Sequence, residues 1–125
     1  MNLIKLIDYK NIYAISGFDI EFDKLIKKTG EYKACKKKLE FNLAILDNAG
    51  GIEKALLYKN IEKLSNVDNL YSIRNISALN PRTIFCCAVD DNTYILLTSF
   101  FEKSSSDYDK AIIKAQNIKK SLEID

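Results

Sequence analysis

The chain has 125 residues, of which 47% are hydrophobic and 29% are charged. This composition predicts one folded domain over residues 1–125 and excludes a disordered or low-complexity chain. A formal net charge of +2 does not by itself require a nucleic-acid partner, and the absence of histidine excludes Ser-His, Cys-His and His-metal mechanisms.

The cysteine pattern and the hydrophobic pattern indicate a soluble cytoplasmic protein. Cys35, Cys86 and Cys87 are odd in number and form no Cys-x-x-Cys motif, so we expect reduced, mostly buried thiols and no metal site. Residues 1–8 are apolar but carry Lys5 and Asp8, which argues against a signal peptide. No apolar run reaches the roughly 18 residues that span a membrane.

The first half of the chain predicts one strand and two helices. Residues 11–15 are rich in β-formers and predict a first strand. Apolar residues at helical spacing predict helices over 19–28 and 31–47, each followed by glycine. The pattern over 52–64 is mixed, and Ala55–Tyr58 fits either a short helix or extended chain.

The second half predicts three antiparallel strands and a helix. Strands are expected at 70–74, at 82–89 with both faces buried, and at 93–100 after a turn at 90–92. A polar, N-cap-rich loop then leads into a helix over 108–122. The predicted fold class is therefore α+β, with an antiparallel meander sheet packed against N-terminal helices and a C-terminal helix.

Two arginines form the first candidate site. Arg74 ends one predicted strand and Arg82 begins the next, and adjacent antiparallel strands bring such positions together. Two guanidiniums at one end of a sheet suit phosphate recognition, because each offers bidentate donors and stays charged. The alternative is a pair of solvated arginines beside acidic neighbours.

Glu102, Lys103 and Tyr108 flank the polar loop after the last predicted strand. Antiparallel pairing places this end of the strand beside Arg82, so we expect Lys103 and Tyr108 to converge on the two arginines. Such a set could cleave a phosphodiester without histidine: Lys or Tyr would take the 2′-hydroxyl proton and Arg would stabilise the phosphorane. The alternative is that Tyr108 only packs and Lys103 is only solvated.

Lysines are concentrated before the central strands. A basic run over 24–38 includes Lys36 and Lys37, and a looser stretch includes Lys54 and Lys59. These four are our candidates for contacts with the RNA backbone, although a plain solvated face would have the same composition. Asp90-Asp91-Asn92 is better explained by the turn than by a metal site, and no Gly-rich phosphate loop is present. We expect neither a metal nor a cofactor.

Three motifs in order resemble the RelE/ParE toxin superfamily, and its HigB-like, phage-derived branch most closely. They are Leu70–Arg74, with the pattern Leu-Tyr-x-ϕ-Arg, Asn80–Phe85, which contains Arg-x-ϕ-Phe, and the strand and loop Tyr94–Ser104. The match covers roughly residues 52–120, with order and spacing kept.

This resemblance implies a RelE-like microbial RNase fold and a type II toxin–antitoxin system. The toxin would be an endoribonuclease, or mRNA interferase, that cleaves mRNA on the ribosome by 2′-hydroxyl attack. Its partner would be a cognate antitoxin, expected as a helix-turn-helix protein encoded next door. The resemblance assigns working roles to Arg74, Arg82, Lys103 and Tyr108.

The chain departs from the family pattern in ways that leave the general base open. Glu102 stands in place of the first residue of a basic pair, Ser72 stands where some members have a second basic residue, and the acid-base histidine of some HigB-type members has no counterpart. Two alternatives follow: a ParE-like toxin that inhibits DNA gyrase by protein binding, and a non-catalytic phage-derived relative.

Overall fold

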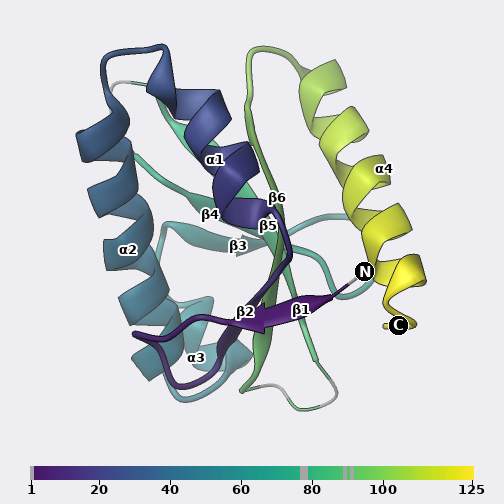
Figure 1. The fold of residues 1–125 in the computed structure, drawn as a ribbon. Helices are drawn as coiled ribbons and strands as arrows, with labels where there is room; N and C mark the ends of the chain where they lie inside the picture. The colour runs from purple at the N-terminus through teal and green to yellow at the C-terminus, as the bar shows by residue number, and fades with distance from the viewer. Residues whose placement is uncertain (1, 77–78, 89, 91) are drawn as a thin grey trace.

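The computed structural model describes residues 2–76, 79–88, 90 and 92–125. Its central layer is a six-stranded β-sheet. Four helices accompany the sheet in these residues (Figure 1). The elements in chain order are β1 (Leu3–Lys5), β2 (Ile12–Ile15), α1 (Phe18–Lys27), α2 (Tyr32–Asn48), α3 (Ile52–Ala55), β3 (Ile61–Lys63), β4 (Tyr71–Arg74), β5 (Pro81–Cys87), β6 (Tyr94–Phe101) and α4 (Ser105–Ser121).

The predicted α+β class is confirmed, and so are the four strands and three helices that the sequence indicated. For the segment Ala55–Tyr58 the sequence allowed either a short helix or extended chain. Only its first residue, Ala55, is helical, as the last residue of α3. The predicted end of the strand at residue 89 and the middle of the turn at residue 91 lie outside the described residues.

The prediction of a simple antiparallel meander is incomplete. β3, β4, β5 and β6 do form an antiparallel meander, but the full order is β1-β2-β6-β5-β4-β3, and β2 pairs with β6 in parallel. A parallel pair needs a long crossover between its strands. Here α1, α2 and α3 lie within the connection between β2 and β6. The sheet is therefore mixed.

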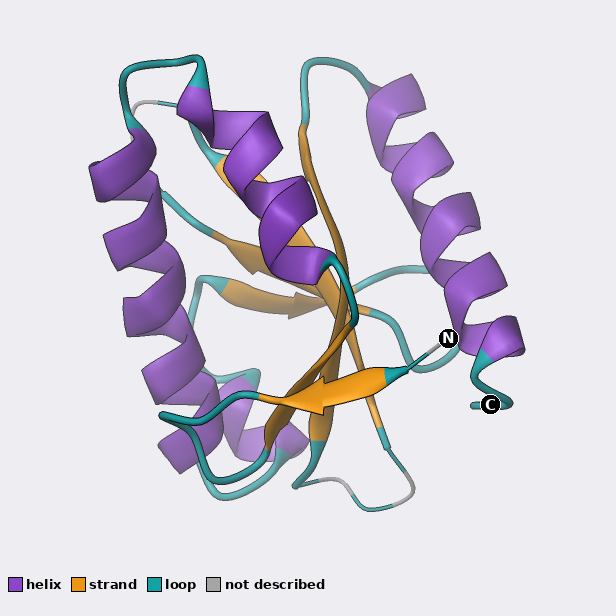
Figure 2. Ribbon diagram, viewed as in Figure 1, coloured by secondary structure: helices purple, strands orange, loops and turns teal. Residues whose placement is uncertain are grey.

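Helices cover both faces of the sheet (Figure 2). One hydrophobic core lies between the sheet and α1, α2 and α3, and a second lies between the sheet and α4. Side chains alternate along β5: Phe85 and Cys87 enter the first core, and Ile84 and Cys86 enter the second. This explains why the sequence of β5 is apolar without alternation. Within the described residues, no helix is long and apolar enough to cross a membrane.

The connection from β6 to α4 is a capped helix start. Asp107 accepts hydrogen bonds from the backbone N–H groups of Lys103 and Ser104, each at 3.0 Å. These bonds hold the pKa of Asp107 below its usual value, and they fix the loop that carries Lys103.

Candidate functional site at one end of the sheet

The two arginines are cross-strand neighbours, as the spacing predicted. Arg74, the last residue of β4, is the register partner of Arg82 in β5. Along β4, Tyr71 and Ile73 contact the core beneath α1 and α2. The alternation of a strand therefore places Arg74 on the α4 face of the sheet. Its side chain is exposed, whereas Arg82 has a side chain only 13% exposed.

Arg82 is held by two carboxylates. Its Nη2 lies 2.9 Å from Oε1 of Glu102, and its Nη1 lies 4.0 Å from Oε1 of Glu62. The guanidinium also lies over the ring of Tyr108, with Cζ 5.9 Å from the ring centroid. Arg82 is therefore a neutralised, fixed group, and Arg74 is the more accessible guanidinium of the pair.

Tyr108, a residue of α4, packs against the sheet beside Arg82 and Glu62. Its ring makes an edge contact with Phe100, with centroids 5.2 Å apart, and its hydroxyl donates to Oε1 of Glu62 at 3.5 Å. Burial is the main cause that raises the pKa of Tyr108, and Glu62 and Glu102 raise it further, against opposing effects of Ser72 and Arg82. The phenol is therefore protonated at neutral pH and acts there as a hydrogen-bond donor.

Lys103 lies at the same end of the sheet as the two arginines but is not part of the cluster around Arg82. It lies in the loop after β6, its backbone N–H is bound by Asp107, and its side chain is exposed. Among the residues that the structure describes, no carboxylate lies within ion-pair distance of its ammonium. The predicted convergence of Tyr108 on Arg82 is therefore present, whereas Lys103 stands free beside them.

The four candidate lysines are divided between the two ends of the sheet. Lys36 and Lys37 lie in the first turns of α2, at the end of the molecule where β6 passes into α4 (Figure 1). Lys36 is paired with Asp23 at 3.3 Å, and Lys37 is exposed. Lys59 is exposed and precedes Asn60, whose carbonyl accepts the backbone N–H of Arg74 at 2.8 Å.

Lys54 is the exception. It lines a hollow with Asn92 at the start of the β6 strand, whereas Arg82 pairs with Phe100 near the other end of that ladder. Cys87 lies five positions after Arg82 along β5, a span of roughly 17 Å. The structure therefore places Lys54 at the opposite end of the sheet from the arginines.

Glu62 is the site residue that sequence reasoning missed. It lies in β3, a strand of three residues that the sequence did not indicate, and pairs in register with Ser72 of β4. Its Oε1 contacts both Tyr108 and Arg82. Because the side chain is still 43% exposed, the carboxylate remains accessible to a ligand. The one available signal was its alternation with Ile61, which is too short to identify a strand.

A buried polar network supports Arg74 from the other face of the sheet. Asn42 of α2 donates from Nδ2 to Oδ1 of Asn75 at 3.1 Å and to the carbonyl of Arg74 at 3.4 Å. Asn75 in turn donates to Thr83 at 3.3 Å, and Thr83 shares a 2.9 Å hydrogen bond with Ser99. The end of β4 is thus tied to α2, β5 and β6.

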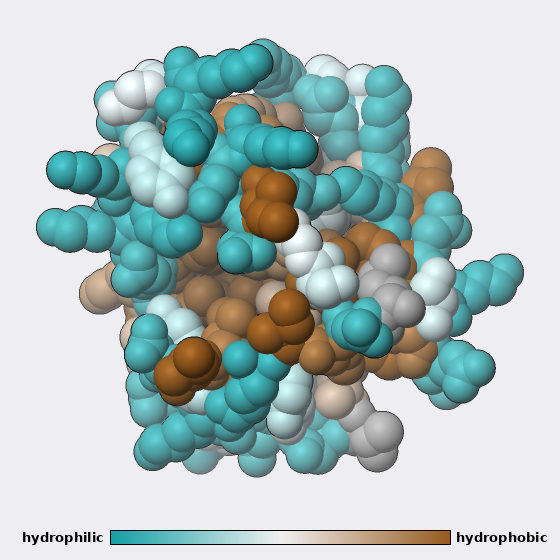
Figure 3. All heavy atoms as spheres, viewed as in Figure 1, coloured by the Kyte–Doolittle hydropathy of each residue, from teal (hydrophilic) through white to brown (hydrophobic). Residues whose placement is uncertain are grey.

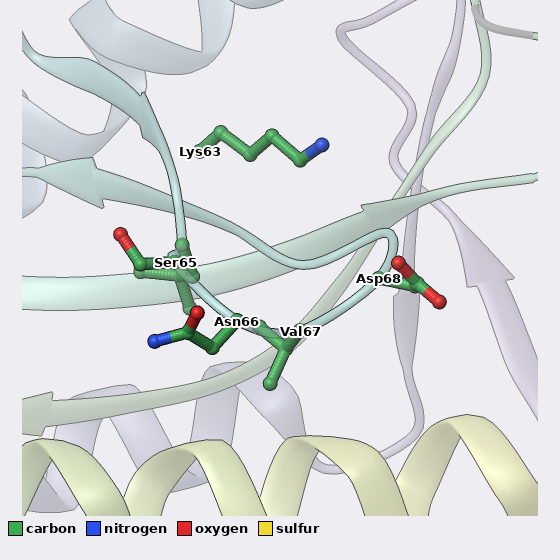
Figure 4. A pocket seen from close by; sticks show the side chains of 6 residues that line it. Lys63, Ser65, Asn66, Val67 and Asp68 are labelled. Carbon is green, nitrogen blue, oxygen red and sulfur yellow. The ribbon is translucent and has the colours of Figure 1, made fainter.

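Other hollows and clusters add no chemistry to this site. A hollow of about 420 Å³ at the β3–β4 connection is lined by the consecutive residues 63–68. Figure 4 shows their labelled side chains pointing in different directions rather than toward one centre. Within the described part of the chain, no three Cys, Asp or Glu side chains gather in a way that could hold a metal ion.

Comparison with known proteins identifies no relative: no family model, curated protein or solved structure matches the chain.

Proposed function

We propose that the chain is the toxin of a type II toxin–antitoxin pair and a metal-independent endoribonuclease. The observation that carries the proposal is the cluster of Arg82, Glu62, Glu102 and Tyr108 beside the exposed Arg74. The order of two strands, three helices, four antiparallel strands and a final helix is compatible with the RelE-like microbial RNase fold that the resemblance to the RelE/ParE superfamily implies.

In the proposed reaction, Glu62 is the general base. Its carboxylate takes the proton of an RNA 2′-hydroxyl, the 2′-oxygen attacks the adjacent phosphorus, and the bond to the 5′-oxygen breaks. The exposed ammonium of Lys103 gives a proton to that leaving oxygen. The products are a 2′,3′-cyclic phosphate and a 5′-hydroxyl end.

The remaining groups bind and orient. Arg74 contacts the scissile phosphate and stabilises the charge that develops on it. Tyr108 donates to Glu62 and holds its orientation, while Arg82 positions Glu62 and Glu102 through its ion pairs. This assignment moves Tyr108 from the role of base, which its raised pKa disfavours, to that of donor.

The proposed target is mRNA on the ribosome, in the cytoplasm, and the proposed partner is a cognate antitoxin. The resemblance supports these two assignments. A toxin that binds DNA gyrase is the alternative, and the same experiment distinguishes it.

The test is induced expression with mapping of RNA 5′ ends. We expect growth arrest, new 5′-hydroxyl ends in mRNA, and a loss of cleavage of about 10²-fold or more in Arg74→Ala, because the variant removes the accessible phosphate ligand. Lys54→Ala, at the far end of the sheet, is the matched control and should cleave normally.

Two results would contradict the proposal. One is full toxicity of the Arg74→Ala/Arg82→Ala double variant, provided that the purified protein is folded. The other is growth arrest with gyrase-linked DNA breaks and intact RNA, which would favour the gyrase alternative.

A further inference from the structure

A cavity of about 450 Å³ opens between the β1–β2 connection and the helices α1 and α2. It lies over the first hydrophobic core, on the face of the sheet away from α4. Figure 3 shows this face hollowed, with hydrophobic residues at the floor of the hollow and polar ones around it. None of its lining residues belongs to the cluster around Arg82.

The floor of the cavity consists of rows of apolar side chains at helical spacing. Phe18 and Phe22 are four residues apart in α1, and Leu39 and Leu43 are four residues apart in α2. Rows of this kind form the ridges and grooves against which another helix packs.

The apolar surface continues beyond the mouth of the cavity. Ile4 and Ile7 also line it, and both are exposed, Ile7 by 96%. A small molecule seated in the cavity would leave Ile7 in water, whereas a protein segment would cover both. Exposed apolar patches with a polar rim mark sites of protein association.

The rim of the cavity carries unpaired negative charge. Asp8, Asp19 and Glu40 lie on it, and none makes an ion pair within the described ranges of the chain. Of the two rim ammoniums, Lys36 is paired with Asp23, whereas Lys5 donates to the carbonyls of Leu6 and Tyr9 and keeps its positive charge. The three carboxylates therefore outnumber the one ammonium that has no carboxylate partner. Burial, followed by Glu40 and Asp8, raises the pKa of the rim residue Tyr9, in agreement with a negative local field.

We infer that this surface docks an amphipathic helix of a partner protein, with apolar side chains in the cavity and lysine or arginine over the acidic rim. We call it the acidic docking surface; its residues are Ile4, Ile7, Asp8, Phe18, Asp19, Phe22, Leu39, Glu40 and Leu43. The inference does not rest on the proposed RNA cleavage.

The test uses two synthetic peptides of about 14 residues, roughly four helical turns. Both carry leucine at i, i+3, i+4 and i+7, but one has lysine and the other glutamate at its polar positions. Binding to the full ¹⁵N-labelled chain is followed by NMR. We expect the lysine peptide to bind at least tenfold tighter and to shift the amides of the acidic docking surface.

Two variants of the protein locate the contact. Ile7→Ser removes an apolar anchor without touching the core and should weaken the lysine peptide about tenfold, because anchors in a docking surface carry most of the binding energy. Ile113→Ser is the matched control, since Ile113 is 58% exposed on α4. Asp19→Lys with Glu40→Lys should reverse the preference between the two peptides.

The inference is overturned if neither peptide binds, if both bind equally, or if the shifted amides lie elsewhere. Equal effects of Ile7→Ser and Ile113→Ser would also overturn it. RNA cleavage plays no part in these measurements, so the two proposals can fail separately.

Discussion

Asn42 shows how one buried polar side chain fixes the position of a proposed catalytic residue. It is 1% exposed and reaches across the first core to Asn75 and to the carbonyl of Arg74. Burial of an amide is costly unless the amide is hydrogen-bonded. These two bonds engage Nδ2, whereas Oδ1 of Asn42 is buried without a hydrogen-bond partner among the described residues. Asn42 therefore fixes the position of α2 relative to the end of β4, and it does so by placing a polar side chain within an otherwise apolar core.

Replacement of this residue should destabilise the fold. Asn42→Leu leaves the side-chain oxygen of Asn75 without the donor that it has in the native chain, so we expect a loss of about 1–3 kcal/mol in the free energy of unfolding. Urea denaturation measures it. Asn117→Leu, at an exposed position of α4, should change stability by less than about 0.5 kcal/mol. Equal losses in the two variants would show that the network does not hold the fold.

At the scale of elements, Glu21 joins α1 to β6 and α4. β2 pairs with β6 only as far as Leu96, so β6 continues beyond its neighbour. Glu21 takes over there: Oε1 accepts from Thr98 Oγ1 at 2.8 Å and from the Ser99 N–H at 3.0 Å, and Oε2 is bound by Lys114. A side chain thus satisfies a strand edge that no strand covers.

This arrangement predicts a pH dependence. Burial acts to raise the pKa of Glu21, but the hydrogen bonds from Lys114, Ser99 and Thr98 outweigh it, so the folded pKa lies below the ordinary value of 4.5. The stabilisation is complete above that value and is lost as the pH falls through the folded pKa.

The stability difference between the native chain and Glu21→Gln should therefore shrink as the pH is lowered from about 6 to about 3. Urea denaturation at each pH measures it. Glu53→Gln, which alters an exposed carboxylate of α3, is the control. A difference that does not change with pH would show that the ionised form of Glu21 is not the stabilising one.

At the scale of the whole molecule, sequence reasoning recovered the elements with a strong period and missed those set by distant contacts. β5 and β6 were found because apolar residues run consecutively over 84–89 and 94–97, and runs of this kind are typical of buried strands. β1 and β3 have three residues each, and β1 is wholly exposed. Their identity depends on pairing with a neighbour, which a local pattern does not contain.

The same limit applied to the site. The spacing of Arg74 and Arg82 predicted their register because a hairpin-like connection joins their strands. Glu62 comes from the edge strand β3 and could not be added by spacing alone. The lysines were grouped by composition, and only the parallel β2–β6 pair and the helices between them determine which end of the sheet each one occupies.

That distribution of lysines leads to a prediction that rests on the proposed RNA binding. Lys37→Glu and Lys59→Glu should each weaken binding of an uncleavable single-stranded RNA and lower its salt dependence by about 0.7 in the log–log slope, because each removes one phosphate contact. Lys54→Glu should have a smaller effect. Filter binding across salt concentrations measures all three, and a larger effect of Lys54→Glu would place the RNA at the other end of the sheet.

Cys86 and Cys87 are consecutive residues of β5, yet each belongs to a different hydrophobic core. Both thiols are buried, so neither is accessible to a reagent in the folded chain, and burial also raises the pKa of Cys86 to about 11. The reactivity of each thiol therefore reports the opening of the helical layer that covers it. A thiol reagent reaches Cys86 when α4 lifts from the sheet and Cys87 when the layer of α1 and α2 opens, so alkylation of two neighbouring residues records two separate unfolding events.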